Sequence, residues 1–595
     1  MKLPGWIFYV LLALFSAVFL ELNHNTLFGW LLFAILLAVF PVLCGRFFPE
    51  AKWWGKLTAF AGFIAAVLLI IAVSWPPVKR VPAVSVKHPA VTEAVMTEYG
   101  PVAGVLNREG DVEVFAGIPY AKPPVNELRW RRPQDPEPWQ ETMICDSFAP
   151  MSMQVTNLPA YDSLVQIIGY HDYSVSLSDN YRTPVSEDSL YLNIWKPSGK
   201  VSGLPVLVYI HGGSLKTGQP WYEDYSGEGF AKSGVIAVNM GYRLGVFGFL
   251  AEEEMLEEEG TAGNFGLLDQ IKALEWVRNN IAQFGGDPDN VTVVGESAGA
   301  VCVDALCVSP LAEGLFQRAV LESSTISSPK PPHSFRLFQE ALQSGKQLME
   351  RYGAHTLAQL RALPAEKIVG EMETQHHVTI DGTVLTDLPY NLRKNGVHNE
   401  TALLHGFNLR ESGPFILFDR ANLKNYESKV REYFGTAADE VLALYSPKSD
   451  EEADQYWAEV YGALYFNYSH DCLHRLMKDL EPVYQYRFSK DNKRLSNWHS
   501  GELPYVFGVI PDSSPLYDES DRNLSALMHQ YWVSFAKTGN PDGKDRPEFP
   551  RDADHLMEFD RNSGPIENPY RSLYDILDRK TGFTSEGKNE TGSGT

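Results

Sequence analysis

A serine framed by glycines is the clearest sign of chemistry in this chain. Residues 295–299 (GESAG) follow the apolar run 291–294 (VTVV) and precede an apolar helical stretch. In such an elbow, a sharp turn between a strand and a helix lifts the serine oxygen above the sheet edge, and small neighbours let the helix pack. The five-residue pattern alone arises by chance about 0.2 times in a chain of this length. Its place between a strand and a helix is what predicts a nucleophile at Ser297.

A nucleophilic serine also needs hydrogen-bond donors for the negative charge that develops on the substrate oxygen. His211, Gly212 and Gly213 directly follow the apolar run 204–210 (LPVLVYI), where a glycine-rich turn exposes backbone N–H groups. An ordinary turn could have this composition, but its coincidence with the serine elbow favours a functional role. We therefore expect the N–H groups of Gly212, Gly213 and Ala298 to form an oxyanion hole.

The chain around these motifs alternates between short apolar runs and helical patterns. The run 269–284 (DQIKALEWVRNNIAQF) has apolar residues at helical spacing and ends at Gly285. Strands that alternate with helices predict a mostly parallel sheet covered on both faces, with its active site at the carboxyl ends of the strands. Five apolar runs fit strands of such a sheet: 204–210, 235–239, 291–294, 318–321 and 401–404.

Several longer motifs occur in a fixed order along the chain. They are FAGIPYA at 115–121, EDSLYLN at 187–193, YRLG at 242–245, the run 264–290 that begins NFGLLDQ, and GNP at 539–541. Together they resemble the type-B carboxylesterase family, which also contains cholinesterases, over residues 99–560. The resemblance implies the α/β-hydrolase fold and hydrolysis of uncharged carboxylic esters through an acyl-serine intermediate. No metal or organic cofactor is implied, because side chains and backbone donors complete this chemistry.

Two further motifs supply the partners of Ser297 within this resemblance. The loop 406–413 (GFNLRESG) is similar to the family's acid-bearing loop, which implies Glu411 as the acid. The loop 498–508 (WHSGELPYVFG) is similar to the family's histidine loop, which implies His499 as the base. The order of serine, acid and histidine is that of α/β-hydrolases. The imidazole would take the serine proton and return it to the leaving alcohol, while the carboxylate fixes the imidazole tautomer.

Two supporting residues complete the expected site. Ser323, in LESS at 321–324, matches a position that hydrogen-bonds near the triad in the family, and Glu296 lies inside the serine elbow.

The resemblance also has departures. Family members with a disulfide near the active-site gorge carry cysteines where Ser152 and Ser189 stand here, so that closure is absent. Packing must then hold residues 154–184, and we expect this segment to be able to move as a flap over the pocket. It lacks the tryptophan with which cholinesterases bind a cation, which disfavours choline esters, although tyrosine faces also attract cations. Its tyrosines are Tyr161, Tyr170, Tyr173 and Tyr181.

The first ninety residues have a different composition. Uncharged apolar runs lie at 3–20, 26–45 and 57–78, and each is close to the ~20 residues with which a helix spans a bilayer. A cleaved signal peptide fits poorly, because the first run is long and no small-x-small site follows it. The expected organisation has four parts: three transmembrane helices in 1–78, a Pro-rich linker at 79–97, the hydrolase domain at 98–580 and a disordered polar tail at 581–595.

Charge gives the expected orientation and excludes some partners. Lys2 and the loop 46–56 hold four Lys/Arg on one side of the membrane, against three that follow the third run, so the positive-inside rule favours a cytoplasmic N-terminus and an exported body. Residues 1–90 carry a net charge of +5, and the rest of the chain carries −28 of the overall −23. Such an acidic body disfavours nucleic acid and suits neutral or cationic substrates.

Other residue patterns predict no further site. The five cysteines show no CxxC pair, and His470 and His474, one helical turn apart beside Asp471 and Cys472, have no evident third ligand for a metal. Two other functions stay open at this point. One is a catalytically silent adhesion or binding module on the same fold, whose members typically lack the nucleophile. The other is a lipase or lactonase that acts at the membrane face. The sequence also leaves the oligomeric state open.

Overall fold

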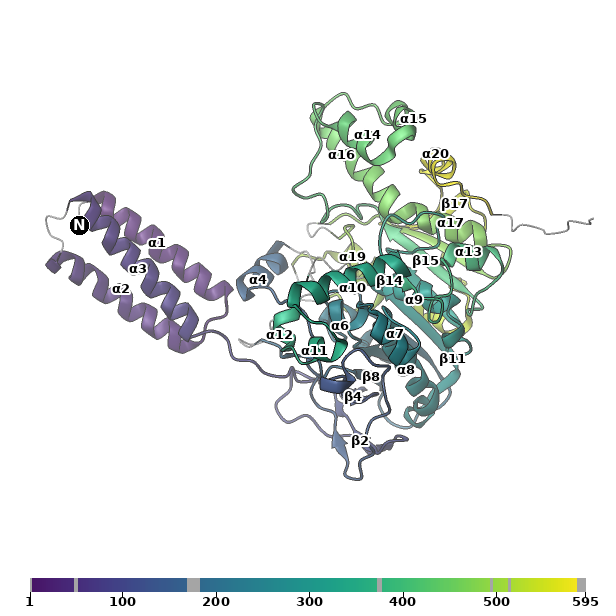
Figure 1. Ribbon diagram of the computed structural model, residues 1–595, viewed down its shortest axis with the longest axis horizontal. Coiled ribbons are helices and arrows are strands. Elements are labelled where there is room, and N and C mark those ends of the chain that lie inside the picture. The colour runs from purple at the N-terminus through teal and green to yellow at the C-terminus, as the bar shows by residue number, and fades with distance from the viewer. Residues whose placement is uncertain are drawn as a thin grey trace, which may run out of the picture. The chain divides into compact units, whose positions relative to one another are not determined.

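The computed structural model describes residues 3–47, 52–168, 182–371, 377–492, 496–511 and 515–585 (Figure 1). It divides into two compact units, of which one comprises Met1–Val81 with Thr156–Pro184 and the other Pro82–Val155 with Val185–Thr595. Helix α20 (Arg571–Thr581) reaches the start of the tail predicted to be disordered. Residues 586–595 of that tail lie outside the described residues.

The larger unit is built on one sheet of eleven strands in the order β18-β17-β16-β15-β12-β11-β9-β10-β8-β4-β3. The six ladders from β17 to β10 are parallel, and those at the two edges are antiparallel. The mostly parallel sheet predicted from the alternating pattern is thus confirmed. The strands are β3 (Val105–Leu106), β4 (Val112–Pro119), β8 (Tyr191–Pro197), β9 (Leu204–Ile210), β10 (Ile236–Met240), β11 (Gly286–Glu296), β12 (Arg318–Glu322), β15 (Leu403–Asn408), β16 (Val483–Phe488), β17 (His555–Phe559) and β18 (Gly564–Glu567).

The apolar runs mark these strands well where no polar residue interrupts them. β9 coincides with the predicted run 204–210, whereas β15 begins two residues later than the run 401–404 and continues to Asn408. The difference arises because His405 and Asn408 are polar yet fully buried, so that hydropathy hides the second half of the strand. Pairing with β16 over six residues fixes its true extent.

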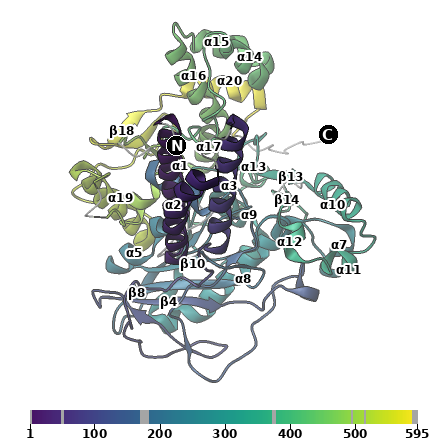
Figure 2. The ribbon, with the colours of Figure 1, turned by 90° about the vertical axis from the view of Figure 1, so that its left-hand side faces the viewer.

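Helices cover both faces of the sheet. α8 (Phe265–Asn280) and α9 (Ala298–Val308) lie on one side, and α19 (Glu519–Thr538) lies on the other (Figure 2). α8 begins four residues before the predicted helix, and a 3-10 turn, Ile281–Phe284, carries the chain to Gly285. The remaining helices of this unit are α5 (Glu228–Lys232), α6 (Gly245–Phe249), α7 (Glu253–Glu259), α10 (Phe338–Tyr352), α11 (Leu357–Arg361), α12 (Ala365–Ile368), α13 (Pro389–Lys394), α14 (Tyr426–Phe434), α15 (Ala438–Leu444), α16 (Asp450–Gly462), α17 (Tyr468–Met477) and α18 (Leu503–Val506), besides α20.

A helical layer formed by α14, α15, α16, α17 and α20 surrounds its own apolar cluster (Figure 1). Within it, a π-helical turn, Ala463–Asn467, joins α16 to α17. Such single turns place one extra residue in the helix and often re-aim side chains at functional sites. Here the turn contains Tyr465 and Phe466, which line the cavity described below.

The smaller unit contains the apolar N-terminal helices α1 (Leu3–Leu22), α2 (Leu27–Phe47) and α3 (Trp53–Val73). By length and composition, α2 and α3 are long and apolar enough to cross a membrane, while the apolar stretch described for α1, Trp6–Leu22, is shorter. α3 lies four to five residues earlier than the third predicted run. It ends ahead of Pro76 and Pro77, because the residue before a proline is disfavoured in a helix.

Part of the predicted flap belongs to this smaller unit. α4 (Pro159–Ile168) approaches α1, and the Ser163 hydroxyl donates to the carbonyl of Leu22 at 2.7 Å. Arg182 lies over the Trp75 ring at 5.7 Å. Tyr161 is half exposed on α4, whereas Tyr170, Tyr173 and Tyr181 lie outside the described residues. The movement expected of the flap stays a prediction.

Ser152 and Ser189, where the resemblance implies cysteines in other family members, face each other in the larger unit. The hydroxyls of Ser152 and Ser189 lie 3.0 Å apart, and Ser152 donates to the carbonyl of Tyr242 at 2.6 Å. Both side chains are buried. A hydrogen bond between the two hydroxyls therefore joins these segments, where the resemblance implies a disulfide in other family members. The short strands β6 (Met151–Ser152) and β7 (Val185–Ser186) pair beside it. The other short strands are β1 (Val95–Met96), β2 (Pro101–Ala103), β5 (Met143–Ile144), β13 (Phe335–Leu337) and β14 (Val378–Ile380).

Candidate active site

Ser297 stands between the end of β11 and the start of α9 with φ 55° and ψ −125°. An L-residue rarely adopts this backbone conformation, and it persists only where its surroundings hold it. The Ser297 N–H donates to the carbonyl of Glu322 at 2.8 Å. A methyl group added at Gly295 would lie 2.3 Å from the carbonyl of Gly299, and one at Gly299 would lie 2.0 Å from that of Ile210. Both glycines of the elbow are thus required by packing.

The structure brings Ser297, His499 and Glu411 together. His499 Nε2 lies 2.8 Å from Ser297 Oγ, and His499 Nδ1 lies 2.5 Å from Glu411 Oε2. Glu411 follows β15, and its second oxygen accepts the N–H of Asn408 at 2.6 Å. Glu411 and His499 are almost completely buried. The three residues therefore form one hydrogen-bonded chain from a fixed carboxylate to the serine oxygen.

Besides Glu411, a second carboxylate lies close to the His499 imidazole. Glu296 Oε1 lies 3.6 Å from His499 Nε2 and accepts the Ser500 hydroxyl at 2.7 Å. Burial lowers the pKa of His499, but Glu411 and Glu296 raise it more, to about 9. Burial and the neighbouring carboxylates likewise raise the pKa of Glu502 to about 8. The imidazolium that forms when His499 accepts a proton is therefore strongly stabilised.

Ser323 is linked to the loop of His499 through Glu502 rather than by direct contact with the imidazole. Its hydroxyl donates to Glu502 at 3.0 Å, and the other oxygen of Glu502 accepts from the Asn408 side chain. Asn408 also donates to the carbonyl of Trp498 at 2.7 Å. Glu502 and Asn408 thereby join the loop that carries His499 to the end of β15. Neither was predicted from the sequence, although both lie within the two motifs that named Glu411 and His499.

The predicted oxyanion hole lies beside the serine. A methyl group built at Gly212 would lie 3.0 Å from Ser297 Cβ, so this backbone runs directly against the serine. Gly213 has φ 100°, and a methyl group there would lie 2.2 Å from the carbonyl of Thr217. Within the described part of the chain, no hydrogen bond is found from the N–H groups of Gly212, Gly213 or Ala298. These three donors are available to a substrate oxygen.

His211 stabilises the conformation of the glycine-rich turn that it forms with Gly212 and Gly213. Its ring stacks on Tyr242 with centroids 4.6 Å apart, and its Nδ1 lies 2.9 Å from the carbonyl of Gly212. Burial lowers the pKa of His211 to about 4, so the ring is neutral and Nδ1 can donate to that carbonyl. The Tyr242 hydroxyl donates to the carbonyl of His211 at 2.8 Å.

A cavity of about 270 Å³ opens beside the serine. Four aromatic side chains form much of its wall, and the rings of Phe415 and Phe466 also contact His499, with centroids 5.2 and 5.0 Å apart. Among the described lining residues, Lys216 is the one permanent cation and none is acidic. The lining consists of Ser214, Leu215, Lys216, Ser297, Ala298, Ser324, His333, Ser334, His377, Phe415, Tyr461, Tyr465 and Phe466.

The histidine pair on α17 belongs to the core. His470 and His474 are fully buried together with His405, whose ring stacks on that of His470 at 5.3 Å. Burial lowers the pKa of His470 to about 3 and that of His474 to about 4, so both rings are neutral. The ligand atoms of Asp471 are instead bound to Arg475 and Arg571.

A mostly parallel sheet with a serine elbow, a histidine and a carboxylate at one edge defines an α/β-hydrolase. The chain belongs to the carboxylesterase family, whose model matches residues 91–572. It is similar to the fumonisin B1 esterase of Sphingopyxis macrogoltabida, with 34% identity over 76% of this chain and 84% of that protein. It is also similar to the para-nitrobenzyl esterase of Bacillus subtilis (strain 168), with 31% identity over 76% of this chain and 90% of that protein.

A solved structure of a PNB esterase supports the same fold. It superposes with a TM-score of 0.67 and 29% sequence identity over 82% of this chain and 99% of that chain. The resemblance predicted from the motifs is confirmed, and the protein is a carboxylic ester hydrolase.

The carboxylates around His499 predict an unusual pH dependence. A general base must be neutral to accept a proton, so kcat/KM falls as the pH drops below the pKa of His499. Because Glu411 and Glu296 raise this pKa to about 9, we expect the acid limb of the profile to lie above the usual imidazole value of about 6.5. Glu296→Gln removes one negative charge but keeps an acceptor for Ser500, and should move the limb to lower pH.

The measurement is kcat/KM for p-nitrophenyl acetate between about pH 5 and 10 in the wild type and in Glu296→Gln. Glu432→Gln, on the exposed face of α14, is the control and should leave the midpoint where it is. An identical midpoint in Glu296→Gln would show that this carboxylate does not act on the imidazole.

Proposed function

We propose that Ser297, His499 and Glu411 form the catalytic triad of a serine carboxylesterase. The observation that carries this proposal is the unbroken chain of hydrogen bonds from Glu411 through His499 to Ser297, which ends at the cavity wall. The 2.8 Å between His499 Nε2 and Ser297 Oγ lies in the range in which a base accepts a proton from a nucleophile, and the 2.5 Å contact with Glu411 orients the imidazole.

The geometry supports two successive half-reactions. His499 accepts the proton as Ser297 Oγ attacks the ester carbonyl, and the N–H groups of Gly212, Gly213 and Ala298 bind the resulting oxyanion. The imidazolium then protonates the departing alcohol, which leaves an acyl-serine. Water attacks this intermediate with His499 again as the base, and the carboxylic acid is released. Throughout, Glu411 keeps Nδ1 protonated and stabilises the positive charge on the ring.

The substrates we propose are uncharged carboxylic esters. The aromatic wall formed by Phe415, Tyr461, Tyr465 and Phe466 can cover an apolar acyl or alcohol group. Lys216 lies at the same cavity, and among the described residues its ammonium has neither an ion pair nor a hydrogen bond. A cationic alcohol such as choline would therefore meet a like charge, and none of the described lining residues is acidic.

We further propose that the N-terminal helices anchor the enzyme in a membrane, with the catalytic unit on the exported side. Most side chains of α2 and α3 are exposed, including Leu31 at 59% and Leu69 at 64%. A contiguous apolar surface of this kind needs a cover, and a bilayer supplies one. The distribution of basic residues, four against three, supports the orientation. A lipase or lactonase acting at the membrane face would be a form of the same function.

Removal of each triad residue should abolish most of the turnover. We expect kcat/KM to fall on the order of 10⁵- to 10⁶-fold in Ser297→Ala and His499→Ala, and on the order of 10⁴-fold in Glu411→Ala. Ser428→Ala, at an exposed serine of α14, is the matched control and should behave as wild type. An organophosphonate probe should label the wild type but not Ser297→Ala. Labelling that survives this substitution contradicts the nucleophile, and an inert wild type would instead favour a silent binding module.

A positive charge on the alcohol part of the substrate should lower kcat/KM. Butyrylcholine and its uncharged isostere, 3,3-dimethylbutyl butyrate, differ only in a quaternary nitrogen. We expect the uncharged ester to have a kcat/KM roughly fivefold higher, because the ammonium of Lys216 repels the cation by about 1 kcal/mol. Lys216→Met should narrow this ratio and leave the uncharged ester nearly unaffected. Faster hydrolysis of butyrylcholine would contradict the proposed substrate class.

Membrane insertion can be separated from peripheral attachment. We expect the full chain, expressed with its N-terminal helices, to stay in the membrane pellet after extraction with alkaline carbonate, because α2 and α3 would lie within the bilayer. Protease added on the exported side should remove the catalytic unit. Release by carbonate would contradict insertion, and protection from that protease would contradict the orientation.

A further inference from the structure

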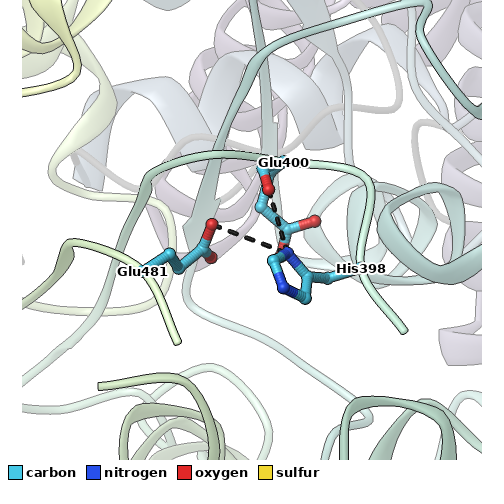
Figure 3. A group of neighbouring side chains, drawn as sticks. All are labelled: His398, Glu400 and Glu481. Atoms are coloured by element: carbon cyan, nitrogen blue, oxygen red, sulfur yellow. Dashed lines mark hydrogen bonds and ion pairs between the residues drawn. The ribbon is translucent and has the colours of Figure 1, made fainter. Parts of the chain in front are cut away.

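Three ligand-type side chains gather away from the active site. His398, Glu400 and Glu481 each offer one atom within 4.8 Å of the others (Figure 3). His398 and Glu400 lie in the loop between α13 and β15, and Glu481 lies in the turn between α17 and β16. Because β15 and β16 are parallel and pair from Leu403 and Val483 onward, this cluster stands at the amino ends of the two strands. The triad stands at the opposite edge of the sheet.

The carboxylates of this cluster have unfilled hydrogen-bonding capacity in the interior. The Glu481 side chain is only 3% exposed, and neither of its oxygens has a hydrogen-bond donor in the described part of the chain. Glu400 is fully buried, and its Oε2 likewise has no donor there. Buried carboxylates without donors are costly, so each such case calls for a bound ion, a water or a proton. Figure 3 shows the Glu481 carboxylate directed at His398 and Glu400.

Charge in the cluster is also unbalanced. The Arg393 guanidinium pairs with Glu400 and with Asp304, the latter at 3.0 Å. If all three were ionised, the carboxylates of Asp304, Glu400 and Glu481 would have one permanent cation among the described residues, Arg393, which would leave two negative charges in a buried region. A divalent cation would balance them.

The third donor indicates what kind of cation fits. His398 Nδ1 is the ring nitrogen that faces the carboxylates, 3.7 Å from Glu481 Oε2 and 2.9 Å from the carbonyl oxygen of Glu400. In this geometry Nδ1–H donates to that carbonyl, so Nδ1 becomes a ligand when the ring proton moves to Nε2 and this hydrogen bond is given up. The His398 side chain is 22% exposed, which leaves a path for entry. One imidazole nitrogen with two carboxylate oxygens is a donor set for Zn²⁺ or Mn²⁺ rather than for Mg²⁺ or Ca²⁺, which prefer oxygen alone.

We propose that His398, Glu400 and Glu481 bind one divalent transition-metal cation of the Zn²⁺ or Mn²⁺ type. The cation ties the loop before β15 to the turn before β16, and through Glu400, Arg393 and Asp304 it is connected to α9, the helix that begins at the serine elbow. Its place at the amino edge of the sheet makes it a structural cation, which does not take part in ester hydrolysis.

The full-length enzyme, stripped with a chelator and dialysed, provides the test. Titration with Zn²⁺ and with Mn²⁺, followed by calorimetry and elemental analysis, should give one tightly bound equivalent of at least one of them. At a hundredfold excess over Kd the unfolding midpoint should rise by roughly 2–3 °C. Esterase activity at a temperature well below unfolding should stay within about twofold of the metal-free enzyme, which separates this site from the proposed triad.

Glu481→Gln is the decisive variant, because it keeps the shape of the side chain and removes a ligand charge. We expect its Kd for the cation to rise at least tenfold and its thermal shift to vanish, and His398→Asn should behave alike. Glu432→Gln is the matched control, with binding like wild type.

The competing occupant is a proton, since burial and the neighbouring Glu400 raise the pKa of Glu481 to about 9. In that case Glu481→Gln is as stable as wild type and neither cation shifts the midpoint. That result, or equally tight binding by Glu481→Gln, overturns the proposal.

Discussion

Parallel pairing of β11, β12, β15 and β16 is the constraint on which the active site depends. Glu296 pairs with Glu322, Glu322 with Gly406, and Gly406 with Tyr486, so that these strands end almost level at one edge. The chain therefore turns out of the sheet at neighbouring points to form the serine elbow and the loops with Glu411 and His499. A register slip by one residue would reverse the facing of every side chain in a strand, and the three groups would no longer meet.

The same edge concentrates four buried carboxylates, which is unfavourable unless each is compensated. Glu411 accepts from Asn408 and His499, Glu296 from Ser500, and Glu322 from the Trp532 indole at 2.7 Å. Burial and the neighbouring Glu502 raise the pKa of Glu322 well above its usual value, and the pKa of Glu502 is raised to about 8. A raised pKa favours the neutral forms of these two groups, so that negative charge is concentrated on Glu411 and Glu296 next to the imidazole, where it stabilises the protonated ring.

Residue chemistry alone could predict only part of this site. Ser297 and its glycines follow from steric rules of the elbow, which the contacts of Gly295 and Gly299 satisfy. Glu411 and His499 came from the family resemblance, because nothing in the local sequence distinguishes them from other acids and histidines. Glu502 escaped prediction since its partner Ser323 lies 179 residues away, and only the fold brings them together. The catalytic roles themselves stay predictions.

Bulk composition was a weaker guide than local pattern. The acidic charge of the body suggested neutral or cationic substrates, yet the described lining of the cavity has Lys216 and no acid. Net charge determines the long-range electric field of a protein. Binding specificity depends instead on the few charged groups that lie within about one Debye length (~10 Å) of the ligand. Similarly, the polar residues His405 and Asn408 conceal the second half of β15 from a hydropathy pattern, because their burial depends on tertiary neighbours.

β15 and β16 run from the cluster of His398, Glu400 and Glu481 at one edge of the sheet to the edge at which the triad stands. β15 begins three residues after Glu400 and ends three residues before Glu411, while β16 begins two residues after Glu481. A strand is nearly inextensible, so a displacement of its start along the sheet moves its end by the same amount. The proposed cation at His398, Glu400 and Glu481 would hold the first residues of β15 and β16 in register and so add to the stability of the sheet. Because the two strands also pair over six residues, from Leu403 to Asn408 on β15, the sheet itself keeps the position of Glu411 when the cation is absent.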